Sequence, residues 1–252
     1  MFKRTQIRST ILVLVVGVSV ALVGCRKQNP AQKLDFAAAV KATNPLAYFR
    51  LETINGSSET GSSIYVSQGG VTGSGSAAPI GMDGNKCVVL DGKDGWIKSG
   101  LMGGIKTAGT IMVWVKLDAL PKEVHRWFYV AGESQEGNDF DVEFGMDNDL
   151  RFYTATGGHS TYSPNPKTLV DQWHMIVATI DYASGSRTMF WDGQPVAVDH
   201  DASHPKNTTT VFTIGASPVW TGRNFGGSVD EVAVWERALS ASEIAELYAA
   251  AK

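Results

Sequence analysis

Short apolar runs recur along this chain, and turn signals such as Asp91-Gly92, Ser184-Gly185 and Asp192-Gly193 separate them. Side chains of a strand point alternately to the two faces of a sheet, and Asp-Gly between two apolar runs is typical of a hairpin turn. The pattern predicts strands at residues 46–51, 86–90, 96–99, 110–117, 127–131, 140–144, 150–154, 173–181, 187–191, 195–198, 211–215 and 229–235. Closely spaced strands without long helices between them indicate an all-β sandwich rather than a parallel α/β sheet.

Two short helices are expected at the ends of this series of strands. Residues 34–43 carry apolar side chains on one side, and Pro45 stops the helix. A second helix is expected after Ser240, which precedes Glu243 by three positions in a capping-box pattern. Residues 56–79 are rich in Gly and Ser, so they are predicted to form a long irregular loop with at most one short strand.

The predicted strand at 229–235 is apolar on both sides. Simple alternation places Val229, Ala233 and Trp235 on one face, and the opposite face then holds Val232 and Val234. A strand that is apolar on both faces is typically covered on both. We therefore predict an inner strand here, closed off by the C-terminal helix.

Residues 1–25 have the pattern of a targeting segment and are excluded from the fold. The basic residues Lys3, Arg4 and Arg8 precede an apolar run at 11–23, which is too short to span a bilayer comfortably. Such a segment directs a chain out of the cytoplasm. An uncleaved N-terminal anchor is the alternative, and both interpretations attach the protein to a membrane.

The apolar run ends in the sequence LVGC at residues 22–25, which resembles the lipobox of bacterial lipoproteins. The resemblance implies cleavage before Cys25, which then carries the lipid anchor as the first mature residue. Residues 26–33 are polar and are expected to form a tether. The residue after the cysteine is Arg26 and not Asp, which favours the outer membrane in an organism that has one. The implied location is the cell envelope, facing away from the cytoplasm.

Charge argues against nucleic acid as a partner. The chain has 22 basic and 25 acidic residues, and removal of the segment 1–25 leaves a net charge of −6. Phosphate backbones are bound by clustered Lys and Arg, and no such cluster stands out. Only Cys87 then remains for the fold, so no intramolecular disulfide is expected, and its apolar surroundings predict a buried thiol.

The C-terminal stretch has a pattern of closely spaced matches to a known family. It consists of Gly227, Val229, Asp230, Glu231, Val232, Val234, Trp235, Arg237, Ala238, Leu239, Ser240, Glu243, Ile244, Leu247 and Tyr248. This ending resembles that of the LamG-like jelly-roll domain, a member of the concanavalin A-like lectin/glucanase superfamily. Residues 36–52 are similar to the start of such domains, and the strands between follow in the family's order.

The resemblance covers residues 34–252 and implies one domain. The implied fold is a two-sheet antiparallel jelly-roll sandwich with a short C-terminal helix. A fold of this kind hosts many functions, so the ligand does not follow from it.

Asp139, Asp141 and Glu143 alternate along a predicted strand and therefore share one face. They resemble the E-x-D-x-E motif of the β-glucanase branch, which implies a nucleophile, a helper and an acid/base for glycoside hydrolysis. The shorter Asp139 departs from the motif at the nucleophile position. The alternative is a solvated strand face, with the apolar residues of 140–144 turned inward.

The resemblance also implies a calcium site. Calcium takes six to eight oxygen ligands, and Glu52 and Asp230 are the candidates that the terminal motifs supply. First and last strands can run side by side in a jelly roll, which would bring the two together. Asp139, Asp147 and Asp149 are weaker candidates. The alternative for Glu52 and Asp230 is hydrogen bonding to loop backbone.

Aromatic residues in or beside loops offer a third kind of site, because sugars stack on exposed Trp and Tyr faces. Trp127, Tyr162 and Trp220 are the candidate ligand contacts. The alternative is core packing, which is the commoner role of an aromatic residue in a sandwich.

Together these patterns favour a non-catalytic, lipid-anchored envelope module that binds carbohydrate or a protein partner, with calcium as a candidate cofactor. The chain contains neither H-E-x-x-H nor G-x-S-x-G. Two alternatives stay open: a β-glucanase-like hydrolase that uses Asp139, Asp141 and Glu143, and a purely structural envelope module.

Overall fold

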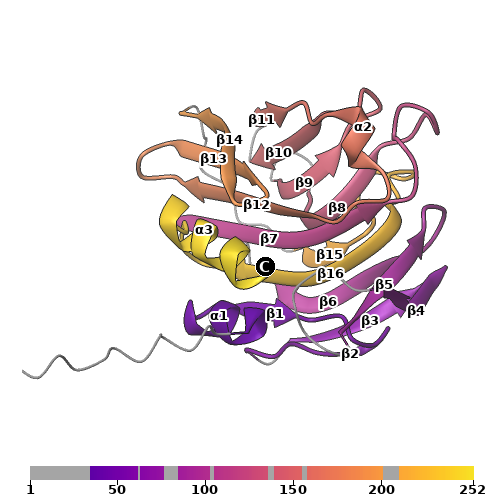
Figure 1. Ribbon diagram of the computed structural model, residues 1–252, viewed down its shortest axis with the longest axis horizontal. Coiled ribbons are helices and arrows are strands. Elements are labelled where there is room, and N and C mark those ends of the chain that lie inside the picture. Colours follow the sequence, from indigo (N-terminus) through magenta and orange to yellow (C-terminus); the bar gives the residue numbers. More distant parts are fainter. Residues whose placement is uncertain are drawn as a thin grey trace, which may run out of the picture. The chain divides into compact units, whose positions relative to one another are not determined.

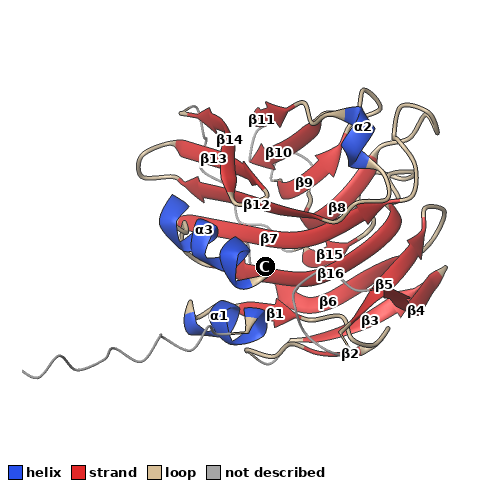
Figure 2. Ribbon diagram, viewed as in Figure 1, coloured by secondary structure: helices blue, strands red, loops and turns tan. Residues whose placement is uncertain are grey.

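Two antiparallel β-sheets make up most of the described chain (Figure 1, Figure 2). The computed structural model describes residues 35–252 except 62, 77–84, 103–104, 136–138, 155–157 and 201–209. The predicted signal segment with Cys25 and the tether at 26–33 lie outside these residues. Among the described residues, no helix is long and apolar enough to cross a membrane.

The first sheet, called sheet A, has the strand order β14-β13-β12-β7-β16-β5-β4, and β1 pairs with β16 beside this path. All of these pairings are antiparallel. Its strands are β1 (Ala47–Phe49), β4 (Val71–Ser76), β5 (Lys86–Asp91), β7 (Ala108–Leu117), β12 (His174–Asp181), β13 (Ser186–Trp191), β14 (Gln194–Asp199) and β16 (Gly226–Trp235).

The second sheet, called sheet B, has the strand order β11-β10-β9-β8-β15-β6-β3-β2 and is also antiparallel throughout. Its strands are β2 (Gly56–Ser57), β3 (Ile64–Gln68), β6 (Trp96–Met102), β8 (Phe128–Glu133), β9 (Phe140–Phe144), β10 (Leu150–Thr154), β11 (Gly158–Tyr162) and β15 (Val211–Ile214). The two sheets form the antiparallel sandwich that the sequence predicts.

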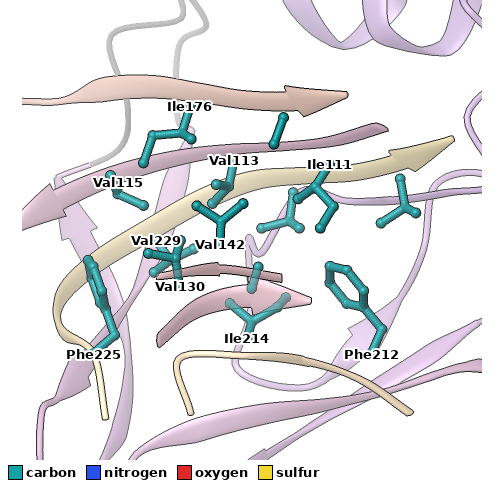
Figure 3. Packing of buried hydrophobic residues seen from close by; sticks show 14 of the residues in the cluster. Ile111, Val113, Val115, Val130, Val142, Ile176, Phe212, Ile214, Phe225 and Val229 are labelled. Carbon is teal, nitrogen blue, oxygen red and sulfur yellow. The ribbon is translucent and has the colours of Figure 1, made fainter. Parts of the chain in front are cut away.

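The main core lies between the two sheets (Figure 3). Residues of β7 and β16 in sheet A face residues of β8, β9 and β15 in sheet B. The side chains labelled in Figure 3 are Ile111, Val113, Val115, Val130, Val142, Ile176, Phe212, Ile214, Phe225 and Val229. All of them are fully buried. Burial of this apolar surface is the main force that holds the sheets together.

A second core covers the outer face of sheet A. It is formed by helices α1 (Phe36–Ala42) and α3 (Ala241–Ala250), which pack on Trp114 of β7 and Trp235 of β16. Phe36 meets Trp114 edge to face with ring centroids 6.1 Å apart. Strands β7 and β16 are therefore buried on both faces, which confirms the predicted inner strand (Figure 1).

The predicted faces of β16 are wrong in one respect. Val229 lies in the main core together with Val232 and Val234, while Ala233 and Trp235 lie in the second core. The pairing of β16 with β7 shifts register between Asp230 and Ala233. A β-bulge adds one residue to the strand, so the alternation of side chains reverses beyond it. Simple alternation misses such an insertion.

Every strand predicted from the sequence is present, and the Asp192-Gly193 turn joins β13 to β14 with positive φ angles of 51° and 79°.

The prediction of a long irregular loop at 56–79 is wrong, because β2, β3 and β4 occupy much of this range. On β3, Ile64 and Val66 are exposed and only Tyr65 is buried, so the strand lacks the inward apolar pattern. The sequence also misses β11 and the short helix α2 (Pro166–Leu169).

The capping box of α3 gives a test of how the C-terminal helix is held. The Ser240 side chain accepts from the Glu243 N–H, and the Glu243 carboxylate accepts from the Ser240 N–H at 2.8 Å. We expect Ser240→Ala to lower the free energy of unfolding by about 1 kcal/mol, because a backbone N–H loses its partner. Urea unfolding measures the change. Glu246→Gln, at an exposed position of the same helix, is the control, and an equal loss in both variants would contradict the capping role.

Candidate functional site

Asp139, Asp141 and Glu143 lie at alternate positions along β9 and its N-terminal flank. The side chains between them lie in the core between the sheets: Phe140, Val142 and Phe144. This confirms the predicted inward orientation of the apolar residues. The carboxylates therefore share the outer face of sheet B, on the side away from the core.

The register of sheet B places aromatic residues beside these carboxylates. Glu143 pairs with Tyr129 of β8 and Arg151 of β10. Asp141 pairs with Gly132 of β8 and with Tyr153 of β10. Gly132 has a φ of 149°, and a Cβ at this position would lie 2.4 Å from the Cα of Asp141. Only glycine therefore allows β8 to approach Asp141 this closely.

The predicted solvated face is wrong for two of the three carboxylates. Asp141 is 3% exposed and Glu143 is 1% exposed. The Arg223 guanidinium, from the segment between β15 and β16, lies over them, with its Nη1 donating to Glu143 Oε1 at 2.7 Å. Burial of a carboxylate is expensive unless a cation or hydrogen bonds compensate it, and Arg223 supplies that charge to Glu143.

Arg223 is itself held between two tryptophans. Its guanidinium carbon lies 4.7 Å from the ring centroid of Trp127 and 5.2 Å from that of Trp220. Arg151 lies over Trp127 as well, at 5.1 Å. Trp220 is 43% exposed, and the side chain of Arg223 is 26% exposed. We call Trp127, Arg223 and Trp220 the Trp–Arg–Trp surface.

One polar atom under this surface, Glu143 Oε2, has no hydrogen-bond partner among the described residues. Glu143 is 1% exposed. A buried polar group without a partner costs about 1–3 kcal/mol, so native proteins seldom keep one without a reason. The orphaned carboxylate oxygen marks this position as a candidate site for a ligand that brings hydrogen-bond donors.

The three carboxyl groups of the site differ in how their surroundings change their pKa values. Burial, followed by the nearby charges of Glu143 and Asp139, raises the pKa of Asp141 well above its ordinary value. Burial also raises the pKa of Glu143, but the Arg223 guanidinium opposes that shift. Burial raises the pKa of Asp139, against a hydrogen bond from Ser134. With one guanidinium facing two buried carboxyls, Asp141 is the group that retains the proton.

Hydrolysis of a glycoside needs two carboxyl groups that reach the substrate. In this conformation Asp141 and Glu143 are covered, and Glu143 is bound to Arg223. The resemblance to the β-glucanase motif therefore extends to the alternation of residues on one strand and not to an open pair of carboxyls.

The third aromatic candidate, Tyr162, lies apart from Trp127 and Trp220. It pairs with Leu150 and packs against the core between the sheets. Its ring centroid lies 5.6 Å from that of Trp191, which also contacts His174 at 4.3 Å. The structure brings two of the three predicted contact residues together, and Tyr162 has the packing role that was the alternative.

The sequence reasoning missed Arg223. Its position three residues after Trp220 places it in the same exposed segment, but this spacing is no motif. Its ion-pair partner Glu143 is 80 residues away in the chain. Only the fold brings them together.

The predicted calcium ligands, Glu52 and Asp230, belong to one polar network. The Arg50 guanidinium donates to the Glu52 carboxylate and, at 3.1 Å, to Asn85 Oδ1. Asn85 Nδ2 in turn donates to Asp230 Oδ2 at 2.9 Å. Neighbouring Glu231 has its pKa raised to about 7 by burial, opposed by its contacts with Tyr48 and Arg50. The first and last parts of the domain therefore meet here.

The carboxylate and amide oxygens of this network do not fit a calcium ion. The Arg50 guanidinium already supplies the positive charge beside Glu52, and Asn85 is engaged with both Arg50 and Asp230. The weaker candidates Asp147 and Asp149 face Arg151 instead. Among the described residues, no group of three or more His, Cys, Asp or Glu side chains is arranged to hold a metal ion.

Comparison with known families agrees with the fold. A family model described as "Laminin_G_3: Concanavalin A-like lectin/glucanases superfamily" matches residues 91–245, more than half of the chain. The chain belongs to this superfamily. No curated protein matches the sequence significantly.

Solved structures with the same fold include binding domains of bacterial toxins. The binding domain of Paraclostridial Mosquitocidal Protein 1 has a TM-score of 0.65 and 13% identity, covering 82% of this chain and 52% of that one. The botulinum neurotoxin serotype G binding domain has a TM-score of 0.63 and 11% identity, covering 81% of this chain and 50% of that one. The chain thus spans about half the length of these structures, and at such identities the likeness shows the fold alone.

The raised pKa of Asp141 predicts a pH dependence of stability. The folded protein keeps this proton at pH values where the unfolded chain, with an aspartate pKa of about 3.9, has lost it. The free energy of unfolding therefore falls as the pH rises from about 3.9 toward the raised folded pKa. We expect Asp141→Asn, which cannot ionise, to reduce this fall and to be more stable than the wild type at neutral pH.

Urea unfolding at a series of pH values measures this effect. Glu246→Gln, which removes an exposed carboxylate of α3, is the control and should leave the pH dependence as in the wild type. An Asp141→Asn variant whose stability falls with pH as steeply as the wild type would show that Asp141 does not carry the proton.

The network around Arg50 predicts the response to calcium. We expect the same Tm with calcium and with chelator, because the cationic guanidinium occupies the position beside Glu52. Thermal melting with matched ionic strength, using magnesium as the control ion, measures this. A rise in Tm with calcium that Glu52→Gln removes would instead support the predicted calcium ligand.

Proposed function

We propose that this protein is a non-catalytic binding module that holds carbohydrate on the Trp–Arg–Trp surface. The observation that carries the proposal is the stacking of Arg223 between Trp127 and Trp220, above a buried Glu143 with an orphaned oxygen. The fold supports a binding role, because solved structures that share it include domains named for binding.

The chemistry of the surface suits a sugar. A pyranose ring has an apolar face that packs on an aromatic ring, and the exposed Trp220 offers such a face. Ligand sites combine aromatic walls with a few fixed polar groups. A guanidinium has five N–H donors, and Arg223 gives one hydrogen bond to Glu143. Its other N–H groups can donate to sugar hydroxyls.

The envelope location belongs to the same proposal. A lipid on Cys25, with residues 26–33 as a tether, would hold the module at a membrane surface on the outer side of the cytoplasmic membrane. Glycans of an envelope or of a neighbouring cell would then lie within reach. A protein partner is the alternative occupant of the surface, and binding assays distinguish the two.

A hydrolase that uses Asp139, Asp141 and Glu143 is the second candidate. Its support is the shared outer face of the carboxyls and the separation of their pKa values, since an acid and a base on one site need different pKa values. The binding proposal is preferred because Glu143 is bound to Arg223 and covered.

The test is a binding screen of the purified protein against a panel of polysaccharides, followed by Trp220→Ala. We expect saturable binding, and we expect the variant to lose about tenfold in affinity, or about 1.4 kcal/mol. Val198→Ala is the control, because Val198 is exposed on β14 in sheet A. Calorimetry measures the affinities, and a reducing-end assay runs in parallel.

Absence of binding to every glycan, or equal affinity of wild type and Trp220→Ala, would overturn the proposal. Release of reducing ends that Glu143→Gln abolishes would replace it by the hydrolase.

A further inference from the structure

We infer that Arg223 is the internal occupant of a cation pocket, and that the natural ligand is a glycan with free amino groups. In this view the ammonium of an amino sugar takes the place of the Arg223 guanidinium against Glu143. The inference rests on the proposed carbohydrate function and deepens it by naming the class of sugar. By pocket we mean the space that Arg223 fills in this structure beside Trp127, Trp220 and Glu143.

The side chains around Arg223 form a cation-binding arrangement. Two tryptophan rings lie 4.7 and 5.2 Å from the cationic carbon of Arg223, and the Glu143 carboxylate contacts its Nη1 at 2.7 Å. Aromatic rings around a cation, with a carboxylate beside it, form the arrangement that recognises ammonium groups in ligands. The protein's own guanidinium shows that this place accepts a cation.

Arg223 leaves the Glu143 carboxylate incompletely paired. An arginine can bind both oxygens of a carboxylate, but the hydrogen bond from Arg223 goes to Glu143 Oε1. Glu143 Oε2 is buried and has no hydrogen-bond partner among the described residues. An ammonium carries three donors and can serve both oxygens of Glu143 at once. The pocket therefore offers an external ammonium contacts that its present occupant does not make.

The charge around the pocket is negative. Asp141 and Glu143 lie on β9, Asp139 directly precedes it, and Asp147 lies close to Arg151 beyond the end of β9. Even with Asp141 protonated, the remaining carboxylates outnumber the two arginines when Asp149 is included. A negative surrounding attracts cationic ligands and repels anionic ones. It selects an amino sugar over a uronic acid.

The loop that carries Arg223 offers it a route out of the pocket. This loop is closed by the bridge between Ala216 and Asn224. Within the loop, Gly222 has a φ of 77° and no atom within 4 Å of the place where a Cβ would be. The Trp220 N–H donates to the Ser217 hydroxyl at 3.0 Å, a contact within the loop itself. A pivot at this loop would withdraw Arg223 without disturbing the sheets.

The experiment compares two oligosaccharides of equal length, one of glucosamine and one of N-acetylglucosamine, at a pH where the amine is protonated. We expect Arg223→Ala to bind the glucosamine oligomer at least about tenfold more tightly than the wild type, because the internal competitor is gone. Binding of the acetylated oligomer should not tighten, because an acetamido group carries no positive charge to compete with the guanidinium. Arg151→Ala, which removes the other arginine over Trp127, is the matched control and should show no gain.

The double variant Arg223→Ala with Glu143→Gln should lose the gain, because the carboxylate that holds the ammonium is neutral. If Arg223→Ala does not fold, Arg223→Gln replaces it, since glutamine removes the charge but keeps a hydrogen-bonding side chain. A second readout is the Tm of the arginine variant, which should rise with methylammonium and not with methylurea.

The inference is overturned if Arg223→Ala binds the glucosamine oligomer no more tightly than the wild type does. An equal gain for both oligomers also overturns it, but it leaves the proposed carbohydrate function in place. A gain seen only with oligolysine replaces the amino sugar by a basic peptide. Failure of the proposed function is a different result, in which Trp220→Ala has no effect on any glycan.

Discussion

The fold depends on the burial of β7 and β16 from both sides. Their inner side chains, such as Val113 and Val229, pack against sheet B, while Trp114 and Trp235 on their outer faces are covered by α1 and α3. Because β7 and β16 are buried on both faces, sheet B and both helices pack against the same two strands. The bulge before Ala233 is necessary for this, because it turns Trp235 toward the helices and Val232 toward the sheets.

The same arrangement explains where polar chemistry can lie. Helices α1 and α3 cover sheet A, so its outer face is apolar over much of its area. They do not cover the outer face of sheet B around β9, and there carboxylates alternate with core residues. Asp141 and Glu143 are nevertheless buried, and Arg223 with its flanking tryptophans covers Glu143. A few side chains, and not a whole element, therefore control access to the site.

Two acidic clusters in the molecule illustrate different outcomes of burying carboxylates. In the network of Glu231, a tyrosine and Arg50 contact the buried group, and Arg50 also joins Glu52. Such a closed set of contacts is typical of a structural role. Around Glu143, one carboxylate oxygen lacks a partner among the described residues. This incompleteness distinguishes the cluster around Glu143 from the closed network around Glu231.

The sequence by itself determined the all-β class, the superfamily, the main strands and the capped C-terminal helix, because these follow from local periodicity and short motifs. It also placed Asp141 and Glu143 on one face and proposed Trp127 and Trp220 as contacts. Only the tertiary structure decided that Asp141 and Glu143 are buried, that Arg223 joins the two tryptophans, and that Tyr162 packs against the core. These features depend on contacts between residues far apart in the chain, and a bulge or an ion pair across 80 residues leaves no periodic signal in the sequence.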